Sequence, residues 1–337
     1  MTSGNTKTLR VALAVHGRGR GHASRSARVI PALEAAGFEV HTFAGGAAVA
    51  VLADVPRLTE VETVLPGKAA LRRTAALALQ WRRRLRELEP DVLISDGEAP
   101  SLLAAKALGI PAISVGHGLV FSSCDLPKLP TGQVLWEKMN AAPTTHLASI
   151  RVPVHFAAIE PRLSNTIVAR PERFEPSDAQ AGDTPWLISY FRDGNGGDWL
   201  VELANCGWQI HAFGDGVPDH TNITEHAPDA DEFARLLKGA RGVVGSAGSN
   251  LISECALLGL PMLAIYRADD AEQSLNGLLM HDAGIGVAAT VDAERAQTVA
   301  LFECLIGEDQ RARAEAFHRA LPPVSEVVIN AVRSLAS

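Results

Sequence analysis

Short apolar strands alternate with helical segments along most of the 337-residue chain, and this alternation constrains the fold more than any other feature. The apolar run at 9–15 (LRVALAV) stops at a glycine-rich loop, HGRGRGH, and an Ala- and Arg-rich helical stretch follows over 23–36. The same cycle recurs in the first half, with strands predicted at 38–43, 61–65, 91–95 and 111–115. Strands that alternate with helices form parallel, doubly wound sheets, so we predict an α/β fold.

The cycle lapses once and then restarts. Residues 161–184 form a polar, proline-bearing stretch that is typical of a linker between domains. Beyond it, strands are predicted at 185–191, 207–213, 241–246 and 261–266, and helices at 229–238, 250–258, 272–281 and from 292 to the end. We therefore predict two Rossmann-like, parallel-sheet domains facing across a cleft, with this division: an N-terminal domain at 1–160, a linker at 161–184, a C-terminal domain at 185–320, and a terminal helix at 321–337 able to pack back on the N-terminal domain.

Composition and charge exclude several classes of protein. The chain is 47% hydrophobic and 20% charged with a formal net charge of −7, which argues against a disordered chain and against a nucleic-acid binder. Its four cysteines are scattered without zinc-ligand spacing, so we predict no metal site and a reduced, cytoplasmic protein. Neither a signal peptide nor a transmembrane span is predicted. A basic helix is expected at 68–88. We predict that its apolar stripe packs on the sheet, and the alternative is peripheral contact with a membrane.

The most informative segment lies between 245 and 280. A predicted strand runs into the loop GSAGS at 245–249, and a helix is expected to begin at Asn250. Exposed backbone N–H groups and the positive end of a helix make such a loop a site for a pyrophosphate. Glu254 lies one turn into the helix, where its carboxylate can accept hydrogen bonds from ribose hydroxyls. The end of the next strand carries side chains suited to sugar hydroxyls, namely Asp270, Glu272 and Gln273.

The glycine-rich loop at 17–22 indicates a second substrate site, because glycine lets a substrate approach the backbone closely. A dinucleotide fingerprint would require an acidic residue closing the second strand, and that strand ends FEVHTFAGG without one. NAD binding is therefore disfavoured. His22 follows the loop directly, and Asp96 ends the fourth predicted strand.

These motifs resemble those of GT-B glycosyltransferases, both the plant-type enzymes and the bacterial lipid II-forming N-acetylglucosaminyltransferase. The likeness rests on Gly-x-Gly-His-x-x-Arg at 19–25 and, in the second half, on the order Gly248, Asn250, Glu254, Gly259-Leu260-Pro261, Glu272-Gln273 and Asn276. By this resemblance Glu254 holds the ribose of a nucleotide sugar, and Glu272 with Gln273 holds the transferred sugar. The diphosphate would face the 245–249 loop, and the base would rest on backbone around 228–233. Plant-type members carry a histidine where Ser246 stands, so helix N–H groups must bind more of the phosphate here.

The resemblance extends to a glycine-rich loop after the strand at 185–191, although a surface turn explains that loop as well. The donor-binding set implied in this way is Gly245, Ser246, Ala247, Gly248, Ser249, Asn250, Glu254, Asp270, Glu272, Gln273, Arg192 and Gly194.

In the first half the resemblance implies that His22 is the catalytic base and that Asp96 orients it. An imidazole titrates near neutral pH and can accept the proton of an attacking hydroxyl or amine. The alternatives are a capping or solvated role for His22 and a turn or N-cap role for Asp96. The implied acceptor-binding set is Gly19, Gly21, Arg25 and His117, of which Arg25 could instead be solvated and His117 could be a structural turn residue.

The resulting prediction is an inverting, metal-independent transfer of a sugar from a UDP- or dTDP-type donor to a small acceptor. No cofactor is expected beyond the nucleotide sugar, which serves as co-substrate. A hydrolase of the same fold, in which His22 activates water, is the nearest alternative. A catalytically idle partner protein that binds a nucleotide sugar is another, although such a protein would need no base. Neither the acceptor nor the oligomeric state follows from the sequence.

Overall fold

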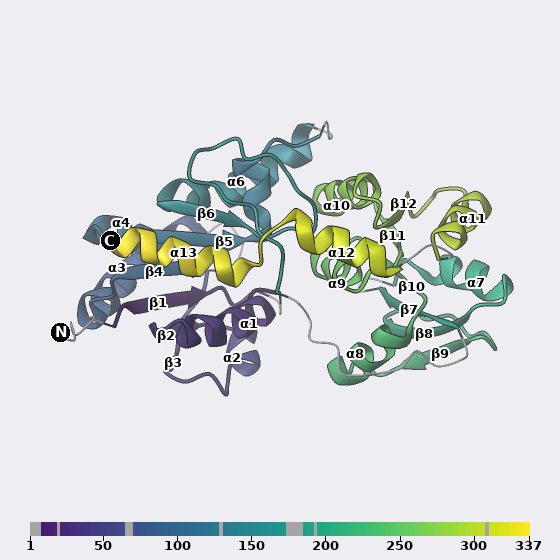
Figure 1. Ribbon diagram of the computed structural model, residues 1–337, viewed down its shortest axis with the longest axis horizontal. Helices are drawn as coiled ribbons and strands as arrows, with labels where there is room; N and C mark the ends of the chain where they lie inside the picture. The colour runs from purple at the N-terminus through teal and green to yellow at the C-terminus, as the bar shows by residue number, and fades with distance from the viewer. Residues whose placement is uncertain are drawn as a thin grey trace.

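The computed structural model describes residues 8–18, 21–64, 70–127, 131–172, 185–191, 194–306 and 310–337. These residues form two α/β domains side by side, each built around a six-stranded sheet with helices on both faces (Figure 1). Every strand pairing in the two sheets is parallel. This confirms the predicted fold class of two doubly wound, Rossmann-like halves.

The N-terminal sheet has the strand order β3-β2-β1-β4-β5-β6. Its strands are β1 (Arg10–Val15), β2 (Glu39–Ala44), β3 (Leu58–Glu60), β4 (Val92–Asp96), β5 (Ala112–Gly116) and β6 (Ile150–Pro153). The helices are α1 (Gly21–Ala35), α2 (Ala47–Val51), α3 (Ala70–Leu88), α4 (Ala99–Leu108), α5 (Val120–Ser123) and α6 (Thr131–Leu147), with a 3-10 turn, η1 (His117–Leu119), before α5. The central strands are buried along their length, because helices cover both faces of a parallel sheet.

The C-terminal sheet repeats this arrangement, with the order β12-β11-β10-β7-β8-β9. Its strands are β7 (Trp186–Phe191), β8 (Gln209–Gly214), β9 (Ile223–His226), β10 (Gly242–Ser246), β11 (Met262–Tyr266) and β12 (Gly286–Thr290). The helices are α7 (Gly197–Asn205), α8 (Ala230–Gly239), α9 (Ser249–Leu258), α10 (Ala271–Asp282), α11 (Arg295–Ile306), α12 (Gln310–Ala320) and α13 (Val324–Ala336).

The sequence predictions were wrong or incomplete mainly at the edges of the sheets. The strand expected at 61–65 is the three-residue β3 at 58–60, and β6, β9 and β12 were not predicted. All four are edge strands. β3 and β9 carry exposed polar side chains and β6 is only four residues long, so these three form no long apolar run, whereas β12 is apolar and largely buried. The helical stretch expected beyond 292 consists of α11, α12 and α13, and α12 and α13 are separated by 321–323, which include two prolines.

The last helix joins the two domains. α12 packs against α9 of the C-terminal domain, and α13 then crosses to the N-terminal domain, where it contacts α1, β4, β5 and β6 (Figure 1). Its apolar face, which includes Val324, Val328 and Val332, is buried in the N-terminal core. Arg170 exchanges backbone hydrogen bonds of 2.9 Å with Pro322 and Val324, so the segment that leaves the N-terminal domain lies beside the segment that returns to it.

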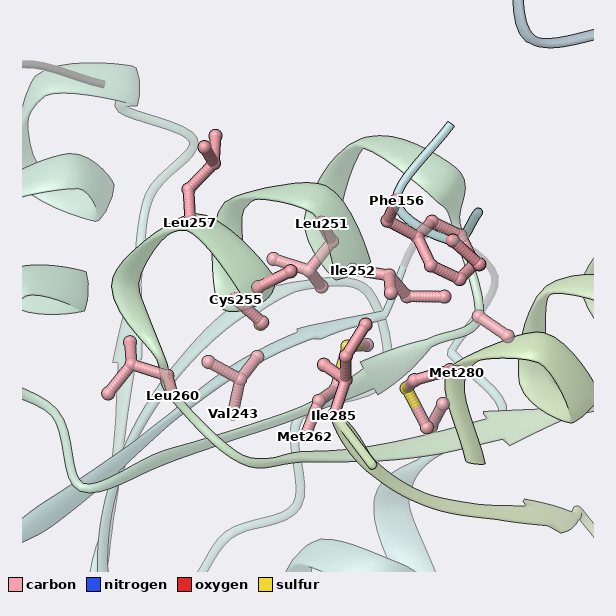
Figure 2. Packing of buried hydrophobic residues seen from close by; sticks show 14 of the residues in the cluster. Phe156, Val243, Leu251, Ile252, Cys255, Leu257, Leu260, Met262, Met280 and Ile285 are labelled. Carbon is pink, nitrogen blue, oxygen red and sulfur yellow. The ribbon is translucent and has the colours of Figure 1, made fainter. Parts of the chain in front are cut away.

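A hydrophobic core also spans the junction between the domains. Phe156, which follows β6, belongs to the same buried cluster as Leu251 and Ile252 of α9 (Figure 2). The cluster continues beneath α9 to Val243 and Met262 of the C-terminal sheet. Since its members come from both halves of the chain, burial of apolar surface holds the domains together.

The basic helix α3 is anchored to the N-terminal domain through its apolar side. Leu77, Trp81 and Leu85 are buried, and the Trp81 ring meets Phe43 edge-on at 5.1 Å between centroids. The apolar stripe of α3 therefore forms part of the protein interior. Among the described helices, none combines the length and the apolar character needed to cross a membrane.

Each sheet has one position at which the strand order reverses. In the N-terminal sheet it lies between β1 and β4, and in the C-terminal sheet between β7 and β10. Ligands of doubly wound sheets bind beyond the carboxyl ends of the strands at this position. The predicted site loops follow β1, β4, β7 and β10, so the topology places them at the two binding crevices.

Candidate active site

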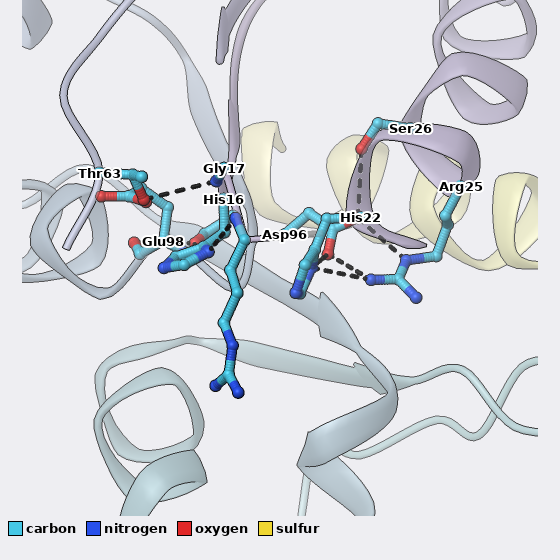
Figure 3. Close-up of polar contacts among 10 residues, drawn as sticks. His16, Gly17, His22, Arg25, Ser26, Thr63, Asp96 and Glu98 are labelled. Atoms are coloured by element: carbon cyan, nitrogen blue, oxygen red, sulfur yellow. Dashed lines mark hydrogen bonds and ion pairs between the residues drawn. The ribbon is translucent and has the colours of Figure 1, made fainter. Parts of the chain in front are cut away.

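His22 and Asp96 meet at the reversal point of the N-terminal sheet (Figure 3). His22 is the second residue of α1, and Asp96 is the last residue of β4. His22 Nδ1 lies 2.6 Å from Asp96 Oδ1, and the Asp96 side chain is only 2% exposed. Asp96 does not cap α4, whose N-cap is Glu98. The structure therefore brings together the two residues that the sequence analysis paired.

Two further side chains of α1 complete the surroundings of Asp96. Arg25 Nε donates a hydrogen bond of 2.9 Å to Oδ2, and Arg25 Nη2 also contacts Oδ1. The Ser26 hydroxyl donates to Oδ2 at 3.1 Å. Burial alone would raise the pKa of the Asp96 carboxyl, but the charge of Arg25 and the neighbouring His22 lower it to about 2. Asp96 is thus an ionised, acceptor-only group at neutral pH.

The ionised state of Asp96 fixes the tautomer of a neutral His22. A carboxylate can only accept, so Nδ1 must carry the hydrogen that faces Asp96. Arg25 Nη2 lies 3.2 Å from Nδ1 but is itself a donor, so this contact is not a hydrogen bond in that tautomer. The lone pair of a neutral His22 is therefore on Nε2, which has no hydrogen-bond partner among the described residues. The side chain is 31% exposed, so Nε2 is available to a substrate proton.

Gly97 makes room for the histidine. It has a positive φ of 79°, and a β-carbon at this position would lie 2.8 Å from His22 Cε1. The same β-carbon would lie 3.3 Å from the β-carbon of His16. A side chain here would be strained in its backbone and would displace the imidazole, so glycine is required by both conformation and space.

The GSAGS loop adopts the predicted arrangement at the reversal point of the C-terminal sheet. Ser246 ends β10, Gly248 is the N-cap of α9, and the helix begins at Ser249, one residue earlier than predicted. No acidic residue stands in the first turn of α9, and no side chain caps it. Its N–H groups therefore remain available for an anion.

The N-termini of α1 and α9 face each other across the domains. A β-carbon at Gly21 would lie 2.8 Å from Nδ2 of Asn250. The first turn of α1 also lacks acidic residues. Two positive helix ends therefore converge beside His22, and their combined field favours a negatively charged ligand.

Glu254 lies one turn into α9 and turns toward the N-terminal domain. Burial raises the pKa of its carboxyl, and the charge of Arg28 on α1 opposes that rise. Glu254 therefore lies at the interface of the two domains, within the electrostatic reach of a cation from the opposite side.

Asp270, Glu272 and Gln273 gather at the start of α10. Asp270 is the N-cap, and its Oδ1 accepts a hydrogen bond of 2.9 Å from the Gln273 backbone N–H. The Gln273 amide donates to the other carboxylate oxygen at 3.1 Å. Glu272 instead points across the junction, where its Oε1 lies 3.7 Å from Nε2 of His117. Burial and the neighbouring Asp270 raise the pKa of Glu272, while the charges of Arg18 and His22 lower it.

The remaining predicted residues are placed as follows. Gly194 lies just before α7 with a φ of 69°, close to the backbone of 215–216. Gly19 and Arg192 fall outside the described residues. The segment expected to carry the nucleotide base, 228–233, forms the loop and first turn of α8, which Asp229 caps through hydrogen bonds to two backbone N–H groups.

Sequence comparison identifies the family. A family model described as glycosyl transferase family 1 matches residues 9–304, which is most of the chain. The chain belongs to glycosyl transferase family 1. No curated protein sequence matches it.

Solved glycosyltransferase structures share the fold of this family 1 member along its whole length. The glycotransferase of kitacinnamycin has a TM-score of 0.72 at 17% identity, covering 98% of this chain and 99% of that one. MurG from Acinetobacter baumannii has a TM-score of 0.64 at 16% identity, covering 97% and 100%. The glycosyltransferase VinC, solved in complex with dTDP, has a TM-score of 0.63 at 15% identity, covering 97% and 99%. The overall arrangement is therefore that of a GT-B glycosyltransferase.

The surroundings of His22 in this family 1 chain also include a polar group that the sequence analysis missed (Figure 3). Glu98 is fully buried, and its Oε2 accepts a hydrogen bond of 2.8 Å from the Thr63 hydroxyl (Figure 3). Burial raises the pKa of Glu98 to about 7. His16 lies beside this group and beside His22, with 5.6 Å between the two ring centroids. The position of Glu98 two residues beyond Asp96, at the same strand end, could have indicated it.

His155, at the junction between the domains, is a second residue that the sequence analysis missed. His155 is buried against His117, and nothing in its sequence surroundings suggested a role. In the part of the chain that the structure describes, no group of three or more His, Cys, Asp or Glu side chains is arranged to hold a metal ion.

Proposed function

We propose that this family 1 glycosyltransferase moves a sugar from a UDP- or dTDP-type nucleotide sugar to a hydroxyl or amine of a small acceptor, with inversion at the anomeric carbon. The observation that carries the proposal is the position of the His22–Asp96 pair directly opposite the N-terminus of α9. A base and an anion site that face each other across a cleft are what a direct displacement needs.

The donor would bind on the C-terminal side. Its diphosphate would lie at the first N–H groups of α9, those of Ser249 and Asn250, its ribose at Glu254, and its sugar near Glu272 and Gln273. The free N–H groups of α9 and the absence of acidic side chains from its first turn support the phosphate assignment. The dTDP in the VinC structure supports the donor class by analogy of fold. The charges of Arg18 and His22 lower the pKa of Glu272, so Glu272 lies within electrostatic reach of the proposed base, which supports the sugar assignment.

The acceptor would bind on the N-terminal side, within reach of His22. Nε2 takes the proton of the attacking hydroxyl or amine as its oxygen or nitrogen bonds to the anomeric carbon. The bond from that carbon to the diphosphate oxygen breaks on the opposite face, and the nucleoside diphosphate leaves with the electron pair. Asp96 stabilises the imidazolium that results, and Arg25 keeps Asp96 ionised. Helix N–H groups stabilise the leaving diphosphate, so the proposal includes no requirement for a metal.

A product assay tests this proposal and separates transfer from hydrolysis. The protein is incubated with UDP-glucose, UDP-N-acetylglucosamine or dTDP-glucose, and release of the nucleoside diphosphate is measured with and without a panel of hydroxyl- and amine-bearing acceptors. We expect release to rise with an acceptor and a glycosylated product to form. We expect His22→Ala to lower turnover about 100-fold or more. Release that is independent of acceptor would indicate a hydrolase, and the absence of any release would indicate a protein that only binds nucleotide sugars.

A further inference from the structure

A polar cluster crosses the junction between the domains beside the candidate site. It consists of His117 and His155 from the N-terminal domain and of Glu272 and Asn276 from α10 of the C-terminal domain, and we refer to these four residues as the junction cluster. His117 lies directly after β5, His155 follows β6, and Glu272 and Asn276 are one helical turn apart on α10. The cluster therefore connects two strand ends of one domain to a single helix face of the other.

His155 packs against His117 and restricts its movement. Its side chain is 1% exposed, and its Nδ1 accepts a hydrogen bond of 2.9 Å from the Ala157 backbone N–H. The two imidazole rings stack with 5.0 Å between centroids and 15° between planes. The next residue, Phe156, is anchored in the hydrophobic core that spans the two domains (Figure 2). His117 is thus held from behind by a residue that has little freedom to move.

Asn276 connects the junction cluster to the donor-side loop. It is fully buried, and its Nδ2 donates a hydrogen bond of 2.9 Å to the carbonyl oxygen of Ala247, within the GSAGS loop. Its side chain also acts as a hydrogen-bonding neighbour of both His117 and His155, which raises the pKa of each ring in part. One amide therefore contacts the loop at 245–249 and faces both imidazoles.

The polar atoms of the cluster are only partly satisfied. Both ring nitrogens of His117, Nε2 of His155 and Oδ1 of Asn276 are buried without a hydrogen bond of good geometry among the described residues. Burial lowers the pKa of His117 to about 4 and that of His155 well below its ordinary value, so both rings are neutral at pH 7. Buried polar groups without partners destabilise the fold, so their presence here indicates a functional role.

The proximity of His117 to Glu272 suggests what that role is. The His117 side chain is 12% exposed, whereas the Glu272 side chain is 48% exposed. Nε2 of His117 lies 3.7 Å from Oε1 of Glu272, just beyond the distance at which it could donate a hydrogen bond to that oxygen. A small shift that let His117 Nε2 donate to Oε1 would hold one oxygen of the carboxylate and leave the other to meet a ligand in a fixed direction.

We propose that His117 is a positioning residue for the transferred sugar, and that it orients Glu272 from the opposite domain while His155 and Asn276 keep it in place. This inference rests on the proposed function, in which Glu272 contacts the sugar of the donor. His117 would then act on the binding of the donor sugar instead of the acceptor, although it belongs to the N-terminal domain.

Calorimetric titration of the full-length protein tests the role of His117. The probes are UDP and dTDP together with UDP-glucose, UDP-N-acetylglucosamine and dTDP-glucose, and the quantity compared is the gain in affinity from a bare nucleoside diphosphate to its sugar conjugate. His117→Phe keeps the ring stacked on His155 but removes both nitrogens. In this variant we expect the ratio of affinity for the nucleotide sugar to affinity for the bare nucleoside diphosphate to fall about 10-fold. Affinity for the bare nucleoside diphosphate should stay within twofold of wild type.

Matched variants separate positioning from a purely structural effect. His117→Gln can still offer a donor to Glu272 and should restore most of the gain, whereas the shorter His117→Asn should not. If His117→Phe fails to fold, the comparison of His117→Gln with His117→Asn carries the test. The double variant Glu272→Gln/His117→Phe should lose no more of the affinity gained from the sugar than either single variant does, because the two residues act as a unit. His41→Phe removes a His–Glu contact of 2.6 Å on β2 within one domain and serves as the control that should change nothing.

The outcomes distinguish this inference from the proposed function. An unchanged gain from the sugar in both His117→Phe and His117→Asn, with nucleoside diphosphate bound normally, would overturn the role of His117 alone. A wild-type protein that binds none of the five probes would overturn the proposed function and this inference with it.

Discussion

His22 Nδ1 and Asp96 Oδ1 lie 2.6 Å apart although the two residues are separated by 74 positions in the chain. The contact exists because the strand order reverses between β1 and β4, which places the start of α1 beside the end of β4. An ionised carboxylate on Nδ1 leaves the lone pair of a neutral imidazole on Nε2. The fold thus presents Nε2 of a neutral His22 as a proton acceptor, as the proposed base role requires.

Replacing Asp96 with asparagine tests this relationship. Asp96→Asn removes the negative charge that stabilises the imidazolium and allows the amide to select the wrong tautomer. We expect kcat to fall about 100-fold or more with little change in the affinity for nucleoside diphosphate. Ser26→Ala is the matched control, because it removes another hydrogen bond to Asp96 without touching His22. A kcat for Asp96→Asn within threefold of wild type would contradict the assigned role of the pair.

The central strands and the glycine loops could be predicted from the sequence, because burial on both faces leaves long apolar runs and loop glycines interrupt them. β3, β6 and β9 were harder to predict, since each lies at a sheet edge and is short or partly polar. β12 is an apolar edge strand, and no strand was predicted there. The pairing of His22 with Asp96 was predicted only through resemblance, as no local pattern shows which strand ends meet. Glu98 and His155 were missed because their importance depends on burial, which a sequence motif does not display.

Glu254 provides a test of the donor side. Its carboxylate lies at the domain interface with Arg28 as a nearby charge, and we propose that it binds the ribose hydroxyls. Glu254→Gln should weaken the binding of nucleoside diphosphate about 10-fold while changing kcat at saturating donor less than threefold, because the ribose lies away from the reacting bond. Glu315→Gln, an exposed glutamate paired with Arg319 on α12, is the control. Equal affinity in Glu254→Gln and wild type would remove Glu254 from the ribose site.

Glu98 should make folding stability depend on pH. Burial raises its pKa to about 7 in the folded protein, against an ordinary value of 4.5. Its neutral form stabilises the fold fully below the unfolded pKa, and this stabilisation is lost as the pH rises through about 7. Between pH 4.5 and pH 8 the free energy of unfolding of the wild type should therefore fall by on the order of 3 kcal/mol relative to Glu98→Gln, which cannot ionise.

Urea denaturation of both proteins at several pH values measures this difference. Thr63→Val, which removes the hydroxyl that donates to Glu98, should steepen the dependence, because that hydrogen bond lowers the pKa of Glu98. Parallel stability curves for wild type and Glu98→Gln across this range would show that Glu98 does not titrate as described.

Calorimetric titration with UDP, dTDP and GDP, each with and without magnesium, tests the proposal that a nucleoside diphosphate binds between the domains through helix N–H groups and Glu254. We expect UDP or dTDP to bind with the same affinity in the presence and absence of magnesium, and GDP to bind at least 10-fold more weakly. Failure of all three nucleotides to bind, or binding that requires magnesium, would contradict it.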